Sequence, residues 1–233
     1  MDYNRDSFIN GKFLLINKPI GWTSFQVVNK IRWLIRSSFD IKKIKVGHAG
    51  TLDPLAEGLL IICTGKLTKK ITEFQNTEKE YVGTFYIGAT TPSFDLETPI
   101  NSKCPIKNIN LNKLNLASKK FLGTLQQTPP IFSAIKLKGK KLYDYARKGE
   151  IVELKKREIN VSEFKITKVS LPLVDFKIKC SKGTYIRSIA NDFGEELKVG
   201  AYLHKLIRTS VGDFKLENAM TIEGFEEIIR KQL

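Results

Sequence analysis

The segment GHAGTLDPLAEGLLIICTGKLTKK, residues 47–70, joins a polar turn to an apolar run, and the fold prediction starts from it. Asp53 lies in the turn, between Gly50 and Pro54. Glycine permits unusual backbone angles and proline fixes its own φ, so we expect a rigid turn. The run GLLIICTG predicts a buried strand that would hold this turn on a fixed scaffold. Asp53 is therefore a candidate catalytic nucleophile, and the alternative is an ordinary turn aspartate.

Short helices and strands alternate irregularly along the rest of the chain, which favours an α+β fold. After the strand FLLI, Thr23 or Ser24 can cap a helix whose apolar positions keep helical spacing. Between residues 174 and 180, apolar and polar residues alternate, as in a strand with one buried and one solvated face. A helix follows directly, and its apolar stripe places Tyr185 and Arg187 at its first turn.

The charge balance of the chain favours a polyanionic partner. Its 233 residues include 39 Lys and Arg against 24 Asp and Glu, a formal net charge of +15. A general compositional bias toward lysine would produce the same surplus. Residues 124–157 are polar and basic, and we expect a mobile RNA-binding arm in which cations contact phosphates and rings stack on bases. Its basic residues, interleaved with Tyr143 and Tyr145, are Lys136, Lys138, Lys140, Lys141, Arg147 and Lys148.

Several classes of protein do not fit the sequence. Cys63, Cys104 and Cys180 show no CxxC spacing, and the first and last lie in apolar strand patterns, so we expect neither disulfides nor a zinc site. There is no signal-peptide-like apolar region and no run of about 18 apolar residues. We therefore expect a cytoplasmic protein with no membrane contact. A P-loop, a dinucleotide fingerprint and a metal-ligand cluster are all missing.

Five segments, in register along most of the chain, carry a resemblance to a known family. They are INKPIGWTS (16–24), GHAGTLDPLAEG (47–58), KEYVGTFYIG (79–88), PPIFSAIKLKGKKLYDYARKG (129–149) and CSKGTYIRSIANDFGEEL (180–197). Together they resemble the TruB-type tRNA pseudouridine synthases. The resemblance implies a pseudouridine synthase fold, with a mixed, mostly antiparallel sheet flanked by helices. It further implies one catalytic domain over residues 1–233, ending in the helix-like TIEGFEEIIRKQL, without the accessory RNA-binding domain of many members.

The resemblance also implies an activity: isomerisation of uridine to pseudouridine at position 55, in the T loop of tRNA, on a flipped-out base. The reaction breaks the bond between ribose C1′ and uracil N1 and joins C1′ to C5. Because it involves no redox change, no phosphoryl transfer and no net hydrolysis, the resemblance implies no cofactor. The family match makes Asp53 the nucleophile, whether it attacks C1′ or C6 or acts after elimination. Arg187 matches the cation that would pair bidentately with this carboxylate and keep it ionised. The alternative for Arg187 is a solvated arginine at a helix end.

Four further residues match the family's substrate pocket. Tyr81 would stack on the extruded uracil and act as an acid or base, and Tyr185 would support the same pocket. His48 would be inserted where the target base stood, and Leu206 would line the pocket. The alternatives are core positions for the tyrosines and Leu206, and a solvated or structural role for His48.

The loop ATTPSFDLE departs from the family pattern. Asp95 aligns with an acidic residue of the family, whereas Pro92 and Phe94 stand at positions that are normally polar. The role of Asp95 is left open.

Two other functions compete with the enzyme. One is a non-catalytic, tRNA-binding folding chaperone, against which the intact Asp53, Tyr81 and Arg187 argue. The other is the catalytic subunit of a guide-RNA pseudouridylation particle, against which the lack of extra RNA-binding sequence argues. We expect a monomer that binds the T stem-loop of tRNA and has no obligatory protein partner.

Overall fold

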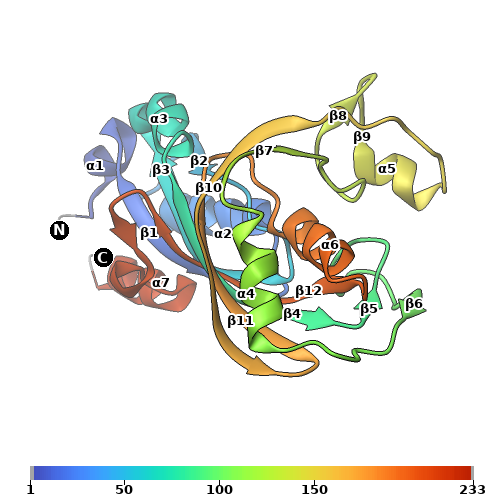
Figure 1. Ribbon diagram of the computed structural model, residues 1–233. Helices are drawn as coiled ribbons and strands as arrows, with labels where there is room; N and C mark the ends of the chain where they lie inside the picture. The colour runs from blue at the N-terminus through green and yellow to red at the C-terminus, as the bar shows by residue number, and fades with distance from the viewer. Residues whose placement is uncertain (1–2, 232–233) are drawn as a thin grey trace. The chain divides into compact units, whose positions relative to one another are not determined.

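The computed structural model describes residues 3–231, which divide into two compact units. Unit 1 contains the chain up to Tyr81 and again from Leu206 onward, and unit 2 is Val82–Lys205. The chain passes from one unit to the other within two strands, β4 (Lys79–Ile87) and β12 (Ala201–Val211), both labelled in Figure 1. Each of these strands therefore contributes residues to both units.

Unit 1 is organised around β3, the strand that follows the Asp53 turn. β3 pairs antiparallel with β1 and β2 and parallel with β12. It is buried along almost its whole length, which confirms the buried strand predicted from GLLIICTG. The elements of this unit besides the two shared strands are α1 (Arg5–Asn10), β1 (Phe13–Lys18), α2 (Ser24–Ser38), β2 (Val46–Ala49), β3 (Ala56–Thr64), η1 (Gly65–Lys70), α3 (Ile71–Gln75), β13 (Phe214–Lys215), η2 (Leu216–Asn218) and α7 (Ile222–Arg230).

The helix predicted after Thr23 is α2, and its start is fixed by a capping box. The Thr23 hydroxyl accepts from the Gln26 N–H at 3.1 Å, and the Gln26 side chain accepts from the Thr23 N–H at 2.7 Å. Its apolar face, which includes Val27 and Ile31, is buried against the sheet and α7. α7 itself ends at Arg230, and residues 232–233 of the predicted C-terminal helix lie outside the described residues.

Unit 2 contains the larger antiparallel part of the sheet, in the order β12, β4, β11, β10, β7. Buried and partly exposed residues alternate along β11, as the sequence pattern predicts. The rings of Phe85, Phe164, Phe176 and Phe193 pack together in its core. Its other elements are β5 (Ala89–Thr90), β6 (Ser102–Lys103), α4 (Leu111–Lys119), β7 (Gly123–Gln127), β8 (Lys136–Leu137), β9 (Lys140–Lys141), α5 (Leu142–Arg147), β10 (Arg157–Ser170), β11 (Leu173–Cys180) and α6 (Ile186–Glu196). The mixed, mostly antiparallel sheet with flanking helices confirms the α+β class.

The predicted arm contains only small elements between its ends. Residues 124–127 belong to β7 and Arg157 begins β10, and these two strands pair antiparallel. The remainder holds the β8–β9 hairpin and α5 (Figure 1). The mobility of the arm stays a prediction. Among residues 3–231, no helix is long and apolar enough to cross a membrane.

Candidate active site

The turn that carries Asp53 is fixed by hydrogen bonds to neighbouring segments of unit 1. The Ser24 hydroxyl accepts from the Leu52 N–H at 2.8 Å and donates to the Leu52 carbonyl at 3.0 Å. On the other side, the Gly21 N–H donates to the Pro54 carbonyl at 2.8 Å. Both neighbours of Asp53 are therefore held through their main chain, which leaves the aspartate on a constrained turn, as the sequence predicts.

Lys18 places a fully buried ammonium group beside this turn. Its Nζ donates to three carbonyls, among them those of Trp22 at 2.6 Å and Pro54 at 3.4 Å. Burial lowers the pKa of Lys18 to about 8, although the carboxylates of Asp53 and Glu57 favour its charged form. Because this attraction is mutual, the ammonium favours the ionised form of Asp53.

Arg208, on β12, is another buried cation of unit 1, with only 1% of its surface exposed. Its Nε donates to the Leu59 carbonyl at 2.8 Å, and its Nη2 donates to the Gly50 carbonyl at 3.0 Å. Gly50 precedes the Asp53 turn and Leu59 follows it. One guanidinium therefore contacts the main chain on both sides of the candidate nucleophile.

The other predicted residues of unit 1 lie on strands. His48 is on β2, opposite Ile62, so it is not a loop residue. Burial and the charge of Arg208 lower the pKa of His48, which favours the neutral imidazole, and a hydrogen bond to the Gly50 main chain partly offsets this effect. Leu206 is 7% exposed and pairs with Ala56, three residues after Asp53. Tyr81 is 8% exposed on β4.

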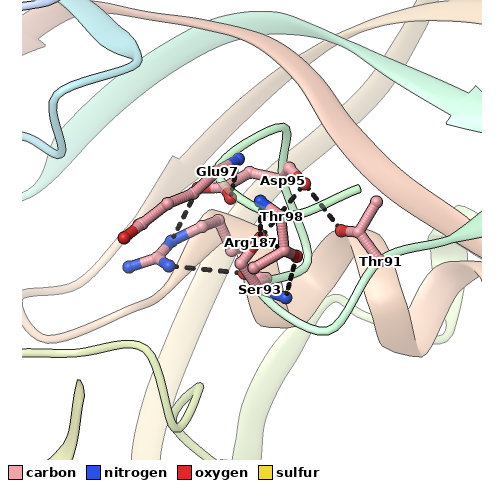
Figure 2. A network of polar contacts seen from close by, with 6 residues as sticks. All are labelled: Thr91, Ser93, Asp95, Glu97, Thr98 and Arg187. Atoms are coloured by element: carbon pink, nitrogen blue, oxygen red, sulfur yellow. Dashed lines mark hydrogen bonds and ion pairs between the residues drawn. The ribbon is translucent and has the colours of Figure 1, made fainter. Parts of the chain in front are cut away.

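In unit 2, Arg187 is buried, with 3% of its surface exposed, so the solvated-arginine alternative is wrong. Its Nε lies 3.6 Å from Oδ2 of Asp95, and its Nη1 donates to the Ser93 carbonyl at 3.3 Å (Figure 2). The other carboxylate oxygen of Asp95 accepts from the Glu97 N–H at 3.0 Å. Asp95, whose role the sequence leaves open, is thus a partner of Arg187.

Short hydroxyl side chains order the loop around Asp95 (Figure 2). Thr91 and Ser93 donate to the Asp95 carbonyl at 2.6 and 3.1 Å, and the hydroxyls of Ser93 and Thr98 lie 2.8 Å apart. Phe94 adopts φ +64°, a left-handed conformation that is rare outside glycine. The loop thus presents a fixed carboxylate to Arg187 although Pro92 and Phe94 depart from the family's polar pattern.

Tyr185 caps the start of α6 and connects it to β7 within unit 2. Its N–H donates to the side-chain oxygen of Gln127 at 2.8 Å, and its carbonyl accepts from the Gln127 amide at 3.0 Å. The Arg157 guanidinium lies 5.2 Å from the centre of the Tyr185 ring. Gln127 ends β7 and Arg157 begins β10, so Tyr185 is at the point where the arm leaves the sheet.

Comparisons with known proteins identify the family. Residues 36–186 match the model described as TruB family pseudouridylate synthase, N-terminal domain. The chain belongs to the TruB family. It is 53% identical over 226 residues to tRNA pseudouridine synthase B of Flavobacterium johnsoniae, covering 97% of this chain and 99% of that protein. The same enzyme of Phocaeicola vulgatus is 51% identical, over 97% of this chain and 96% of that protein.

A solved structure shares the fold of this TruB-family chain. The crystal structure of a Cbf5-Nop10-Gar1 complex contains a chain that matches with a TM-score of 0.70 and 27% identity. The match covers 94% of the present chain and 54% of that one. The likeness confirms the predicted pseudouridine synthase fold.

In this TruB-family chain, two basic residues of the arm lie beside the half-buried ring of Tyr143. The Nζ of Lys141 lies 5.1 Å from the centre of the Tyr143 ring and 2.7 Å from its hydroxyl, and the Arg147 guanidinium lies 5.2 Å from the same ring. Arg147 also lies 4.0 Å from the Glu97 carboxylate. Lys136, Lys138 and Lys140 are exposed, which fits the predicted contacts with RNA phosphates.

Lys18 lies in a segment that carries the family resemblance and Arg208 lies two residues after Leu206, yet the sequence analysis assigned neither a role. The signal that could have found them is strand alternation. Lys18 follows Leu14 and Ile16 at every second position of β1, and Arg208 follows Leu206 in the same way on β12. A cation in the buried register of a strand indicates a structural or functional partner, because lysine and arginine are almost never fully buried unless they are paired.

Two of the three cysteines are buried, as predicted for small core residues. Cys63 and Cys180 are buried, and Cys104 is exposed. Within residues 3–231, no three side chains of His, Cys, Asp or Glu come together as metal ligands would.

Proposed function

We propose that this chain is a tRNA pseudouridine synthase that isomerises uridine 55 in the T loop of tRNA. The observation that supports this best is the 53% identity, over 97% of the chain, to an enzyme named tRNA pseudouridine synthase B. The constrained turn around Asp53 adds to it, because the reaction needs a carboxylate held at a fixed place beside the base.

Asp53 is the nucleophile in this proposal. Its carboxylate adds to ribose C1′ or to uracil C6, or it acts after elimination, and the bond to C5 is made once the base has turned. A buried carboxylate beneath a base would tend to take up a proton. Lys18 opposes that tendency because its ammonium interacts electrostatically with Asp53 within unit 1. The pairing of Arg187 with Asp53 stays a prediction from the family resemblance.

The remaining residues bind the RNA in this proposal. A neutral His48 is suited to replace the flipped base, because an uncharged ring enters a base stack without the desolvation penalty of a charged one. Tyr81 stacks on the uracil and exchanges protons near the ribose, and Tyr185 and Leu206 line the pocket. The exposed cations of the arm bind the phosphates of the T stem. The enzyme acts as a cytoplasmic monomer without a cofactor.

A guide-RNA particle is the second candidate, because the chain shares its fold with the chain of the Cbf5-Nop10-Gar1 complex. The two candidates differ in what they need. A stand-alone enzyme modifies a bare T stem-loop, whereas a particle subunit requires partner proteins and a guide.

The experiment is a pseudouridine assay with purified protein on a bare T stem-loop RNA. We expect the wild type to convert uridine 55, and Asp53→Asn to bind the RNA normally without turnover. Asp213→Asn, at an exposed turn in the same unit, is the matched control and should react like the wild type. An inactive wild type contradicts the stand-alone enzyme, and an active Asp53→Asn contradicts the nucleophile.

A further inference from the structure

Arg208 spans the segment that carries Asp53. Two hydrogen bonds from its guanidinium end on the Leu59 and Gly50 carbonyls, at 2.8 and 3.0 Å, and these residues stand at the two ends of that segment. A guanidinium is planar and presents its donors in a fixed fork, so two bonds from one group set the distance between the two carbonyls. A lysine ammonium, whose three donors share one freely rotating atom, would fix this distance less rigidly.

The main chain around Arg208 is shaped for this contact. Gly50 has φ +95°, and a Cβ added there would lie 3.4 Å from Nη1 of Arg208. A Cβ added to Gly58 would lie 2.8 Å from the Arg208 main-chain nitrogen and closer still to its carbonyl oxygen. Side chains at these two positions would strain the backbone, and the one at Gly58 would overlap β12. The close approach of β12 therefore depends on glycine at position 58, whereas glycine at position 50 is favoured by its backbone angle.

The positive charge of Arg208 is not neutralised by these partners. In the described part of the chain, its bonds end on carbonyl oxygens and not on a carboxylate. Burial lowers the pKa of His48 most strongly, and the charge of Arg208 lowers it further. The same field favours the anionic form of a carboxylate held nearby. Arg208 thus acts on the segment in two ways, through geometry and through charge.

We propose that Arg208 is a positioning residue for the isomerisation: by bridging the Gly50 and Leu59 carbonyls, it fixes the segment on which Asp53 approaches the flipped base. The inference rests on the proposed function. Arg208 touches the main chain and not the substrate, so its loss should affect the chemical step and leave RNA affinity largely intact. A displacement of about 1 Å in a catalytic group is enough to slow a reaction by about 100-fold.

The test compares Arg208→Lys and Arg208→Gln with the wild type. Single-turnover rates are measured on a saturating T stem-loop, dissociation constants by filter binding, and folding by thermal denaturation. We expect the rate to fall by about 100-fold in Arg208→Gln and by about 10-fold in Arg208→Lys, with dissociation constants within about threefold of wild type. Ser210→Ala, a buried polar position two residues along β12, is the matched control and should keep the wild-type rate.

A third variant separates positioning from a general loss of packing. In Arg208→Ala, free guanidinium ion can occupy the vacated space and bridge the same two carbonyls, so it should restore part of the rate, whereas ammonium should not. Wild-type rates in Arg208→Lys and Arg208→Gln overturn the proposal. Equal losses of rate and affinity, or loss of folding in both variants, overturn it as well, because Arg208 is then a binding or purely structural residue. An inactive wild type refutes the proposed function instead.

Discussion

Replacement of Gly58 by alanine tests how closely β3 and β12 approach beside the Asp53 segment. Gly58 has φ +105°, where a Cβ costs about 1–2 kcal/mol. The added carbon would also lie 2.8 Å from the main-chain nitrogen of Arg208 and nearer to its carbonyl oxygen. These neighbours are backbone atoms of a paired strand and cannot rotate away, so overpacking should add about 1–3 kcal/mol.

Gly21→Ala isolates the first of these two effects. Gly21 has φ +82°, and no atom lies within 4 Å of a Cβ added there. Both variants place a Cβ on a residue with positive φ, but only in Gly58→Ala does this Cβ overlap other atoms. At about 2–4 °C per kcal/mol for a chain of this size, we expect Gly58→Ala to melt about 2–12 °C below Gly21→Ala. The assay is thermal denaturation followed by circular dichroism. Equal melting temperatures would refute the steric argument and with it the close approach of the two strands.

Three other predictions follow from the charged groups. Arg187→Lys keeps the charge but loses the planar fork, so turnover should fall by about 10-fold or more while RNA affinity changes little; equal losses would indicate a phosphate contact. Neutralising Lys138, Lys140 and Lys141 together should flatten the slope of log K for RNA binding against log salt by roughly two units. An unchanged slope in a salt titration would show that the RNA binds to another surface. Lys18 has a pKa of about 8 in the folded chain, against an ordinary value of 10.5. Between these two pH values the unfolded chain binds more protons than the folded chain, so the stability of the wild type should rise with pH across that window. Urea midpoints should show this rise relative to Lys18→Met, and parallel curves would contradict it.

Local features of the fold were accessible from the sequence because they depend on neighbouring residues. The Thr23 cap and the helix after it follow from residues within one turn, and the alternation in β11 follows from the two-residue period of a strand. The rigid turn at Asp53 follows from its glycine and proline neighbours. In each case the information lies within about ten residues of the element.

The sequence did not reveal all the partners of the buried charged residues. Arg187 meets Asp95 from a distant loop, and two bonds of Arg208 reach residues far earlier in the chain. Lys18 ends a strand, where a lysine ordinarily extends into solvent; two of the carbonyls that it bonds, those of Pro19 and Trp22, are local, but the third belongs to Pro54, 36 positions away. The roles of Asp53, Tyr81 and Arg187 in the reaction came from the family resemblance and stay predictions.

The bond from Arg208 to Leu59 joins residues that are 149 positions apart in the chain. During synthesis, the Asp53 segment therefore leaves the ribosome long before the strand that fixes it. Contacts between such distant residues form late in folding, since the intervening chain must first be ordered. A nascent or truncated polypeptide that lacks β12 would hold the Asp53 turn through Ser24 and Gly21 but without the bridge from Arg208. Competence for the reaction would thus arrive only with the last part of the chain, so that incomplete products would not act on tRNA.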